Sequence, residues 1–115
     1  VKELLETIES TNTRNQILIT SFNIDALKIL RNESETIPIG ILYEKLPENW
    51  KKDKVFLNAV TIHLDYRFLT LNQLEEINLS NTKAFVYTCN DPDEITQLWD
   101  AGLSGVITDD PLKFI

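Results

Sequence analysis

The sequence predicts an α/β protein with a mainly parallel sheet built from a βα repeat. Five short apolar runs rich in Ile and Val stand at residues 16–20, 37–43, 59–64, 84–88 and 105–108. These runs are nearly continuous rather than alternating, which is typical of strands that are buried on both faces. Their starts are about 20 to 25 residues apart, and segments with helical signals fill the gaps.

The first helical signals lie before and after the first strand. Residues 1–11 have the pattern of an amphipathic helix, with Leu4, Leu5 and Ile8 predicted on its inner face. Asn23 follows the first strand and is predicted to cap the next helix, since its side chain can accept from a free backbone N–H.

Later helix starts carry capping motifs. Thr70 and Gln73 have the spacing of a capping box. Asp91, Pro92 and Glu94 offer a cap, a proline at the first helical position and a capping-box acid.

The remaining helical predictions concern packing and helix ends. Gly102 is predicted to end the helix that follows Asp91, and Trp99 on that helix to pack against the sheet. The segment 44–58 is the least regular, although Pro47 can open a helix there and Trp50 can pack onto the sheet.

Size and charge limit the classes of function. A chain of 115 residues is enough for one domain. Its net charge of −7 disfavours nucleic acid and anionic membrane surfaces as partners, since both attract basic patches. The sequence shows no signal peptide and no apolar run near the ~18 residues of a membrane span. With one cysteine, no internal disulfide can form, and we expect a cytoplasmic protein.

Polar and aromatic residues gather where the predicted strands end. In parallel βα units these carboxyl ends share one edge of the sheet, which is where ligands bind. The strand ends are residues 20–22, 42–44, 63–65, 87–90 and 108–110.

Two architectures fit five βα units. An open, doubly wound sheet of the receiver type requires an acidic pair after the first strand and a lysine after the fifth, and both are missing. A flavodoxin-like sheet requires a phosphate-cradling loop after the first strand, but "TSFN" has no glycine. The other architecture is part of a (β/α)8 barrel.

Four stretches carry a family resemblance: "ILITSFNIDALKIL", "IPIGILYEKL", "VTIHLDYRFLT" and "FVYTCNDPDEITQLWDAGLSGVITDDP". In this order and spacing, over residues 16–115, they resemble the second half of bacterial cytoplasmic glycerophosphodiester phosphodiesterases. The resemblance implies a partial TIM (β/α)8 barrel that holds about the last five strands. Residues 1–115 would be a single domain whose amino-terminal catalytic half is absent, and the start at Val1 rather than Met fits missing upstream residues.

The resemblance also implies a reaction, the hydrolysis of a glycerophosphodiester to an alcohol and glycerol 3-phosphate. The family uses two histidines as acid and base and a divalent metal, Mg²⁺ or Ca²⁺. The motifs that supply them belong to the amino-terminal half. We therefore expect no catalytic or metal-binding residue and no phosphodiesterase activity in this chain alone.

Three residues are expected to bind substrate. By the resemblance, Tyr87 and Phe22 would form apolar walls for the glycerol or alcohol moiety, although each is also compatible with a purely structural aromatic. His63 lies near a strand end and can face phosphate or glycerol, or it can be a partly buried histidine with a structural hydrogen bond.

Four residues near the last strands have structural interpretations. Asn90 and Asp91 suit a turn and a helix cap, Cys89 a small buried group, and Asp109 a residue that holds the last turn.

A partial barrel leaves exposed sheet edges, so a homodimer through these edges is a candidate assembly. Glycerophosphodiester is the expected ligand of the complete protein. The alternative function is a non-catalytic domain with an open five-stranded sheet that binds a small molecule or regulates a partner.

Overall fold

A single sheet of five parallel strands organises the chain. The computed structural model describes residues 2–11 and 17–115. The strands follow one another in chain order across the sheet. They are β1 (Ile19–Ser21), β2 (Ile39–Tyr43), β3 (Thr61–Asp65), β4 (Lys83–Tyr87) and β5 (Gly105–Val106).

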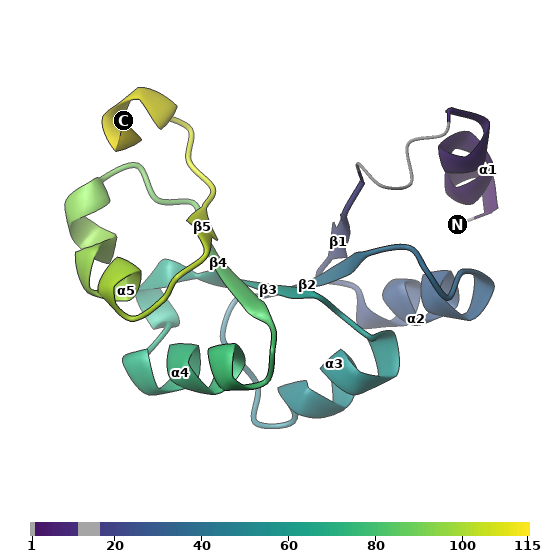
Figure 1. Ribbon diagram of the computed structural model, residues 1–115, viewed down its shortest axis with the longest axis horizontal. Helices are drawn as coiled ribbons and strands as arrows, with labels where there is room; N and C mark the ends of the chain where they lie inside the picture. Colours follow the sequence, from purple (N-terminus) through teal and green to yellow (C-terminus); the bar gives the residue numbers. More distant parts are fainter. Residues whose placement is uncertain (1, 12–16) are drawn as a thin grey trace.

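The strand order decides between the two architectures. In a doubly wound sheet the order reverses at a switch point, and helices then cover both faces. Here every neighbouring pair is parallel and the order never reverses. In Figure 1 the strands form a curved row, and α2, α3 and α4 all lie on the same side of it. This arrangement is that of a partial (β/α)8 barrel.

Helices connect the strands, and those after β1 and β3 begin at the predicted caps, whereas α3 begins at Trp50 rather than at the predicted Pro47. They are α1 (Lys2–Thr11), α2 (Ile24–Glu33), α3 (Trp50–Leu57), α4 (Leu71–Leu79) and α5 (Thr96–Asp100), with short 3₁₀ turns η2 (Tyr66–Phe68), η3 (Pro92–Ile95) and η4 (Pro111–Phe114). The Asn23 side chain accepts from the Ala26 N–H at 3.1 Å. Thr70 and Gln73 form the predicted reciprocal capping box, at 3.1 and 3.0 Å.

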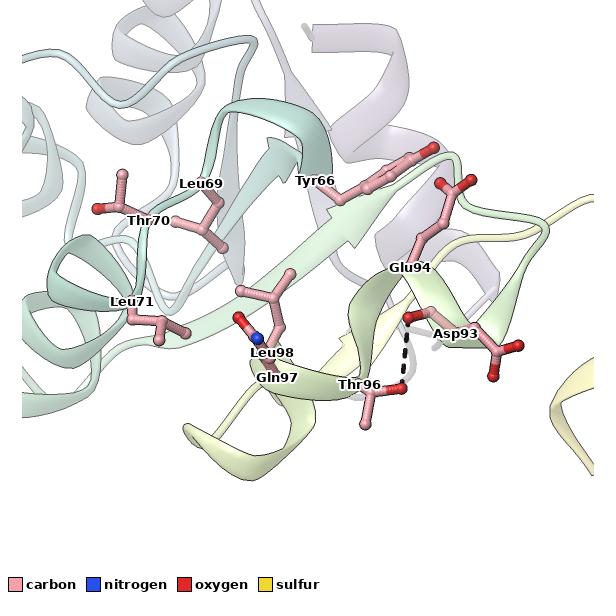
Figure 2. A pocket seen from close by; sticks show the side chains of 9 residues that line it. All are labelled: Tyr66, Leu69, Thr70, Leu71, Asp93, Glu94, Thr96, Gln97 and Leu98. Atoms are coloured by element: carbon pink, nitrogen blue, oxygen red, sulfur yellow. Dashed lines mark hydrogen bonds between the residues drawn. The ribbon is translucent and has the colours of Figure 1, made fainter.

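The segment after β4 differs from the prediction in one residue. Asp91 caps η3 through the Asp93 N–H, Pro92 opens η3, and Gly102 follows α5 with a φ of +98°. Glu94, however, does not form the predicted capping box, and its side chain extends toward the Tyr66 ring instead (Figure 2).

Strand bounds also differ at both ends of the sheet. The predicted first strand covers 16–20, whereas β1 begins at Ile19, and residue 16 lies outside the described residues. β5 ends at Val106 rather than at residue 108. The backbone ladder nevertheless continues, since the Ile107 N–H donates to the Val86 carbonyl at 2.8 Å and the Cys89 N–H donates to the Ile107 carbonyl at 3.0 Å.

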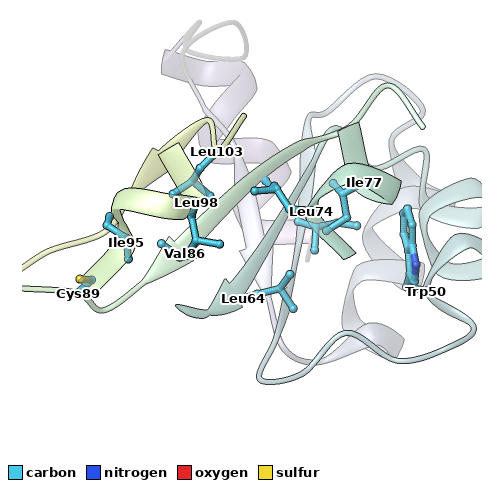
Figure 3. Close-up of a cluster of buried hydrophobic side chains, with 11 residues drawn as sticks. Trp50, Leu64, Leu74, Ile77, Val86, Cys89, Ile95, Leu98 and Leu103 are labelled. Atoms are coloured by element: carbon cyan, nitrogen blue, oxygen red, sulfur yellow. The ribbon is translucent and has the colours of Figure 1, made fainter. Parts of the chain in front are cut away.

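Two apolar clusters lie between the sheet and the helices. The larger one, drawn in Figure 3, joins β3 and β4 to α4 and α5 and includes the predicted Trp50, which is 2% exposed. The other joins β2 to α1 and α2 through Ile8, Leu27 and Ile39. Two predicted contacts are wrong, because the Leu4 and Trp99 side chains are both 40% exposed. They lie on the outer faces of short helices that bury only one stripe.

The other face of the sheet is the concave one, and no helix of the described chain covers it in Figure 1. Alternation along the strands points Thr61, His63 and Phe85 to this face, opposite the buried Ile62, Leu64 and Val86. Within the described residues, no helix has both the length and the apolar character needed to cross a bilayer.

Candidate functional site

The carboxyl edge of the sheet gathers two aromatic side chains from distant strands. Phe22 follows β1 and Tyr87 ends β4, yet their rings meet edge to face with centroids 5.9 Å apart and planes at 84°. Phe22 is 59% exposed, so this pair forms a surface at the edge rather than a core contact. The structure thus brings together two of the three residues expected to bind substrate.

The Tyr87 ring is held by its hydroxyl. The hydroxyl donates to the Tyr43 carbonyl at 2.8 Å, so the side chain reaches over β3 to the end of β2. Burial, and then the nearby Asp65 and Glu44 carboxylates, raises the pKa of Tyr87. The phenol therefore remains a hydrogen-bond donor at neutral pH.

Tyr43 itself anchors the outer layer. Its hydroxyl donates to the Asp53 carboxylate in α3 at 2.7 Å. Burial and this hydrogen bond raise the pKa of Tyr43 well above its ordinary value. Tyr43 therefore holds α3 through its hydroxyl and holds the Tyr87 side chain through its backbone carbonyl.

His63 lies below the aromatic pair rather than within it. It occupies the middle of β3, whereas Tyr87 is paired with Asp65 two residues further along. Two residues along a strand correspond to about 6.6 Å. The imidazole is 5% exposed and stacks on Phe85, with centroids 5.0 Å apart and planes at 14°.

The hydrogen bonds of His63 are incomplete. Nε2 lies 2.9 Å from the Thr61 hydroxyl, and Nδ1 is buried with no partner in the described part of the chain. Burial lowers the pKa of His63, so the ring is neutral. A buried N–H without an acceptor is rarer than a bare acceptor, so the Nε2–H form donating to Thr61 fits best.

Gly40 makes room for this pair. A Cβ at residue 40 would lie 2.3 Å from the Thr61 Oγ1 and 3.1 Å from the His63 Nε2. Glycine on β2 therefore lets the β3 hydroxyl and imidazole occupy the concave face of the sheet.

Asp65 and Arg67 form an ion pair beside Tyr87. Arg67 donates from Nε and Nη2 to the two carboxylate oxygens of Asp65, at 3.0 and 2.6 Å. The Asp65 side chain is 9% exposed and the Arg67 side chain 65%. The hydrogen bonds from Arg67 hold the pKa of Asp65 below its usual range. A cavity of about 340 Å³ opens here, lined by Asp65, Tyr66, Arg67, Tyr87 and Thr88.

A second hollow adjoins this cavity at Tyr66. It has a volume of about 630 Å³ and lies between the start of α4 and the η3–α5 segment. In Figure 2 the Tyr66 ring extends toward the Glu94 carboxylate at one end of the hollow. The adjacent Glu94 carboxylate raises the pKa of Tyr66 to about 12.

The loops after β4 and β5 are tied together by Asn90. Its Oδ1 accepts from the Thr108 hydroxyl at 2.9 Å and from the Asp109 N–H at 2.8 Å. Asp109 thus holds the last turn through its backbone. Cys89 is buried as predicted, and its thiol donates to the Asp91 carbonyl at 3.1 Å.

The described residues do not form a metal centre. Across residues 2–11 and 17–115, no three His, Cys, Asp or Glu side chains are placed to hold a metal ion together. The Mg²⁺ or Ca²⁺ implied by the resemblance therefore does not fit the residues described here.

Sequence reasoning missed the roles of Tyr43 and Arg67. The signal for Arg67 was present as an acid and an arginine two residues apart directly after a strand. Tyr43 gave no such signal, since its partners are 10 and 44 residues away in the sequence.

Comparisons with known proteins agree with this fold. The sequence model of the glycerophosphoryl diester phosphodiesterase family matches residues 1–113. A glycerophosphodiester phosphodiesterase of Caldanaerobacter subterraneus subsp. tengcongensis is 27% identical over 99% of the chain. The chain spans 47% of that relative, about half its length.

Solved structures show the same likeness. A phosphodiesterase of Oleispira antarctica in complex with the product sn-glycerol-3-phosphate is 27% identical, with a TM-score of 0.78 over 84% of this chain and 39% of that one. A glycerophosphodiester phosphodiesterase of Parabacteroides distasonis shares the fold, with 17% identity and a TM-score of 0.79 over 94% of this chain and 45% of that one.

Proposed function

Because the chain belongs to the glycerophosphoryl diester phosphodiesterase family, we propose that it is the carboxyl-terminal part of a hydrolase that converts glycerophosphodiesters to an alcohol and glycerol 3-phosphate. The observation that carries this proposal is the family match over residues 1–113. The product held by the Oleispira antarctica phosphodiesterase, at 27% identity, supports glycerol 3-phosphate as the product class.

In this proposal the chain contributes scaffold and part of the substrate wall. Residues 1–115 form one domain, and the amino-terminal catalytic half lies on a different stretch of polypeptide. The Phe22 and Tyr87 rings form an apolar surface at the carboxyl edge, which suits the carbon skeleton of glycerol or of the alcohol. The bond from Tyr87 to the Tyr43 carbonyl fixes this surface before substrate arrives.

His63 is proposed to support this wall from below. It is the single histidine of the sequence and is 95% buried, so it cannot serve as both acid and base at the edge. Its stacking on Phe85 keeps the layer beneath Tyr87 rigid. The His63 Nδ1, which has no hydrogen-bond partner in the described residues, is the atom that would contact substrate where the complementary half of the barrel leaves space beside it.

The acid, the base and a divalent metal, Mg²⁺ or Ca²⁺, are assigned to the amino-terminal half. When bound, such a metal neutralises the phosphodiester charge. We expect the purified chain to be inactive, and the complete protein to hydrolyse glycerophosphodiesters in a metal-dependent way.

The assay measures release of glycerol 3-phosphate from a glycerophosphodiester, with Mg²⁺, with Ca²⁺ and with a chelator. The chain alone should match the buffer blank under all three conditions. Turnover by the chain alone would contradict the assignment of the acid, the base and the metal to the amino-terminal half. Failure of the complete protein under every condition would contradict the function itself.

The partners follow from the open surface. The concave face and the two edge strands, β1 with three residues and β5 with two, are proposed to contact the other half of the barrel or a second copy of this chain. The net charge of −7 supports the proposal that nucleic acid is not a partner. The buried thiol of Cys89 is compatible with the proposed cytoplasmic location.

A further inference from the structure

A cluster of basic side chains lies on the connections that follow β2 and β3. Arg67 comes two residues after the end of β3, and Lys45 two residues after the end of β2. Both approach the Phe68 ring, with the Lys45 Nζ at 4.6 Å and the Arg67 Cζ at 5.5 Å from its centroid. The sequence separates these two cations by 22 positions, and the fold places both on one ring.

Asp65 sets the direction of the Arg67 side chain. The carboxylate is 9% exposed and takes the Nε and Nη2 donors of the guanidinium. Its Oδ1 also accepts from the Arg67 N–H at 3.0 Å. A guanidinium has five N–H donors, so three remain, two of them on Nη1. This outer edge is the part that binds phosphate oxygens in a two-pronged geometry.

The free edge lies beside the aromatic wall. Arg67 and Tyr87 line the same cavity of about 340 Å³, within the size range of small-ligand sites. The charge of Arg67 also acts on the Tyr87 hydroxyl, against the opposing effects of Asp65 and Glu44. A molecule packed on Tyr87 is therefore within reach of Arg67.

We propose that Arg67, oriented by the buried Asp65, binds an anionic phosphate oxygen of the substrate or product at the carboxyl edge. The inference rests on the proposed function, because it assumes that the carboxyl edge receives a phosphate ester. It adds a substrate-binding residue from this half of the barrel that is independent of any metal.

Directed hydrogen bonds, not net charge, carry the recognition. The Asp65 and Glu44 carboxylates both act on Arg67, and Lys45 lies over the same Phe68 ring as Arg67, so the four groups sum to zero charge. A lysine at position 67 would keep the charge. It would lose the planar set of N–H donors that can bind Asp65 on one side and phosphate on the other. Arg67→Lys should therefore behave like Arg67→Gln.

The first test is an NMR titration of the isotopically labelled chain with sn-glycerol 3-phosphate. We expect the Arg67 Nε–H signal and the Tyr87 and Thr88 amides to shift with the phosphate ester and not with an equal concentration of glycerol. Inorganic phosphate should move the Arg67 signal and leave Tyr87 largely unchanged, which separates anion binding from binding of the ester.

Three variants complete the titration. Arg67→Gln and Arg67→Lys should each weaken binding about tenfold or more, as expected for a lost charge-assisted bond. Lys52→Gln on α3 is the matched control and should leave binding unchanged, since Lys52 is exposed and lines a different hollow that shares no residue with the cavity at Arg67. A circular dichroism melt of each variant shows whether it is folded. If Arg67→Gln does not fold, Arg67→Lys provides the comparison, because it keeps a cation beside Asp65.

The inference is overturned if Arg67→Lys binds as well as the unsubstituted chain, if glycerol causes the same shifts, or if the Arg67 signal does not move. A kinetic measurement on the complete enzyme separates the role of Arg67 from the proposed function. In the complete enzyme, Arg67→Gln should raise KM about tenfold or more. If the Arg67→Gln enzyme is active with an unchanged KM, the role of Arg67 is refuted and the proposed function is not. If the unsubstituted complete enzyme is inactive, the proposed function is refuted, and the titration still tests phosphate binding by Arg67.

Discussion

At the scale of single residues, the concave face depends on glycines that give space to larger neighbours. Gly40 admits the Thr61 hydroxyl and the His63 ring, as its missing Cβ would lie within 3.1 Å of both. Gly105 does the same for Phe85, whose Cε1 would be 2.6 Å from an added Cβ. The His63 and Phe85 rings therefore occupy space that a side chain at Gly40 or Gly105, on the neighbouring strand, would otherwise fill.

His63 is the residue whose protonation should couple to stability. Burial lowers its pKa in the folded state, so the unfolded chain binds the proton more tightly, near pH 6.5. The stability contributed by the neutral ring is complete above that pH and is lost as the pH falls through it. We expect the free energy of unfolding to drop by up to about 1.4 kcal/mol per pH unit below pH 6.5 from this group.

Urea unfolding at pH 7.5 and pH 5.5 measures this drop. His63→Gln removes the titrating group, so its loss of stability between the two pH values should be smaller than that of the unsubstituted chain. The imidazole pKa, read by NMR, should lie below 6.5. A pKa at or above the ordinary value would contradict the buried, neutral state.

At the scale of elements, the connections at the carboxyl edge hold one another in place. Asn90 joins the loop after β4 to the loop after β5 by two hydrogen bonds, at 2.9 and 2.8 Å. Tyr87 similarly joins the end of β4 to the end of β2. The edge is therefore stabilised by contacts between connections, because the strands themselves are short.

Asn90→Ala tests this link. It removes the only acceptor of the two bonds at Oδ1 and should lower the free energy of unfolding by about 1 to 2 kcal/mol. Asp109→Ala is the matched control, because Asp109 donates through its backbone N–H, which alanine retains. Chemical denaturation of both variants gives the comparison, and an equal loss in the two would assign the effect to general loop disturbance.

At the scale of the whole molecule, the sheet is covered on one side only in the described structure. Ile107 alternates with the half-buried Val106 and is 45% exposed, so it points away from the core toward the concave face. A barrel segment of this kind leaves apolar surface that water should not contact. This is the physical reason to expect either the complementary half or a second copy on that face.

Self-association of the chain tests the open face. We expect the apparent mass in size-exclusion chromatography with light scattering to rise with concentration, and Ile107→Asp to suppress the rise. Val55→Asp on the outer side of α3 is the control, since Val55 is 75% exposed yet lies on the covered side of the sheet. A monomer at every concentration, or a larger effect from Val55→Asp, would contradict association through the concave face.

Local chemistry explains why much of the fold was predictable. Apolar runs, the Asn23 cap and the Thr70–Gln73 capping box act within a few residues, and the structure has them as predicted. Trp99, Leu4 and Glu94 were misassigned because their contacts depend on how short helices are turned against the sheet, which a pattern of apolar residues does not fix.

The candidate site was predictable only in part. Strand ends identified the edge, and the family resemblance selected Phe22 and Tyr87, which the structure brings into contact. The resemblance did not single out Arg67, whose place beside Tyr87 depends on an ion pair with Asp65 and on the meeting of two connections at Phe68. The substrate-binding role of Phe22, Tyr87 and His63 stays a prediction.

The sequence by itself determined the parallel βα repeat, the caps of its helices and the family to which the chain belongs, because these depend on residue order and on contacts within a few positions. Only the tertiary structure decided that the strands run in unbroken order, that His63 lies a layer below Tyr87, and that Arg67 and Tyr87 line one cavity. Those facts arise from sheet curvature and from packing between residues far apart in the chain, which no local pattern encodes.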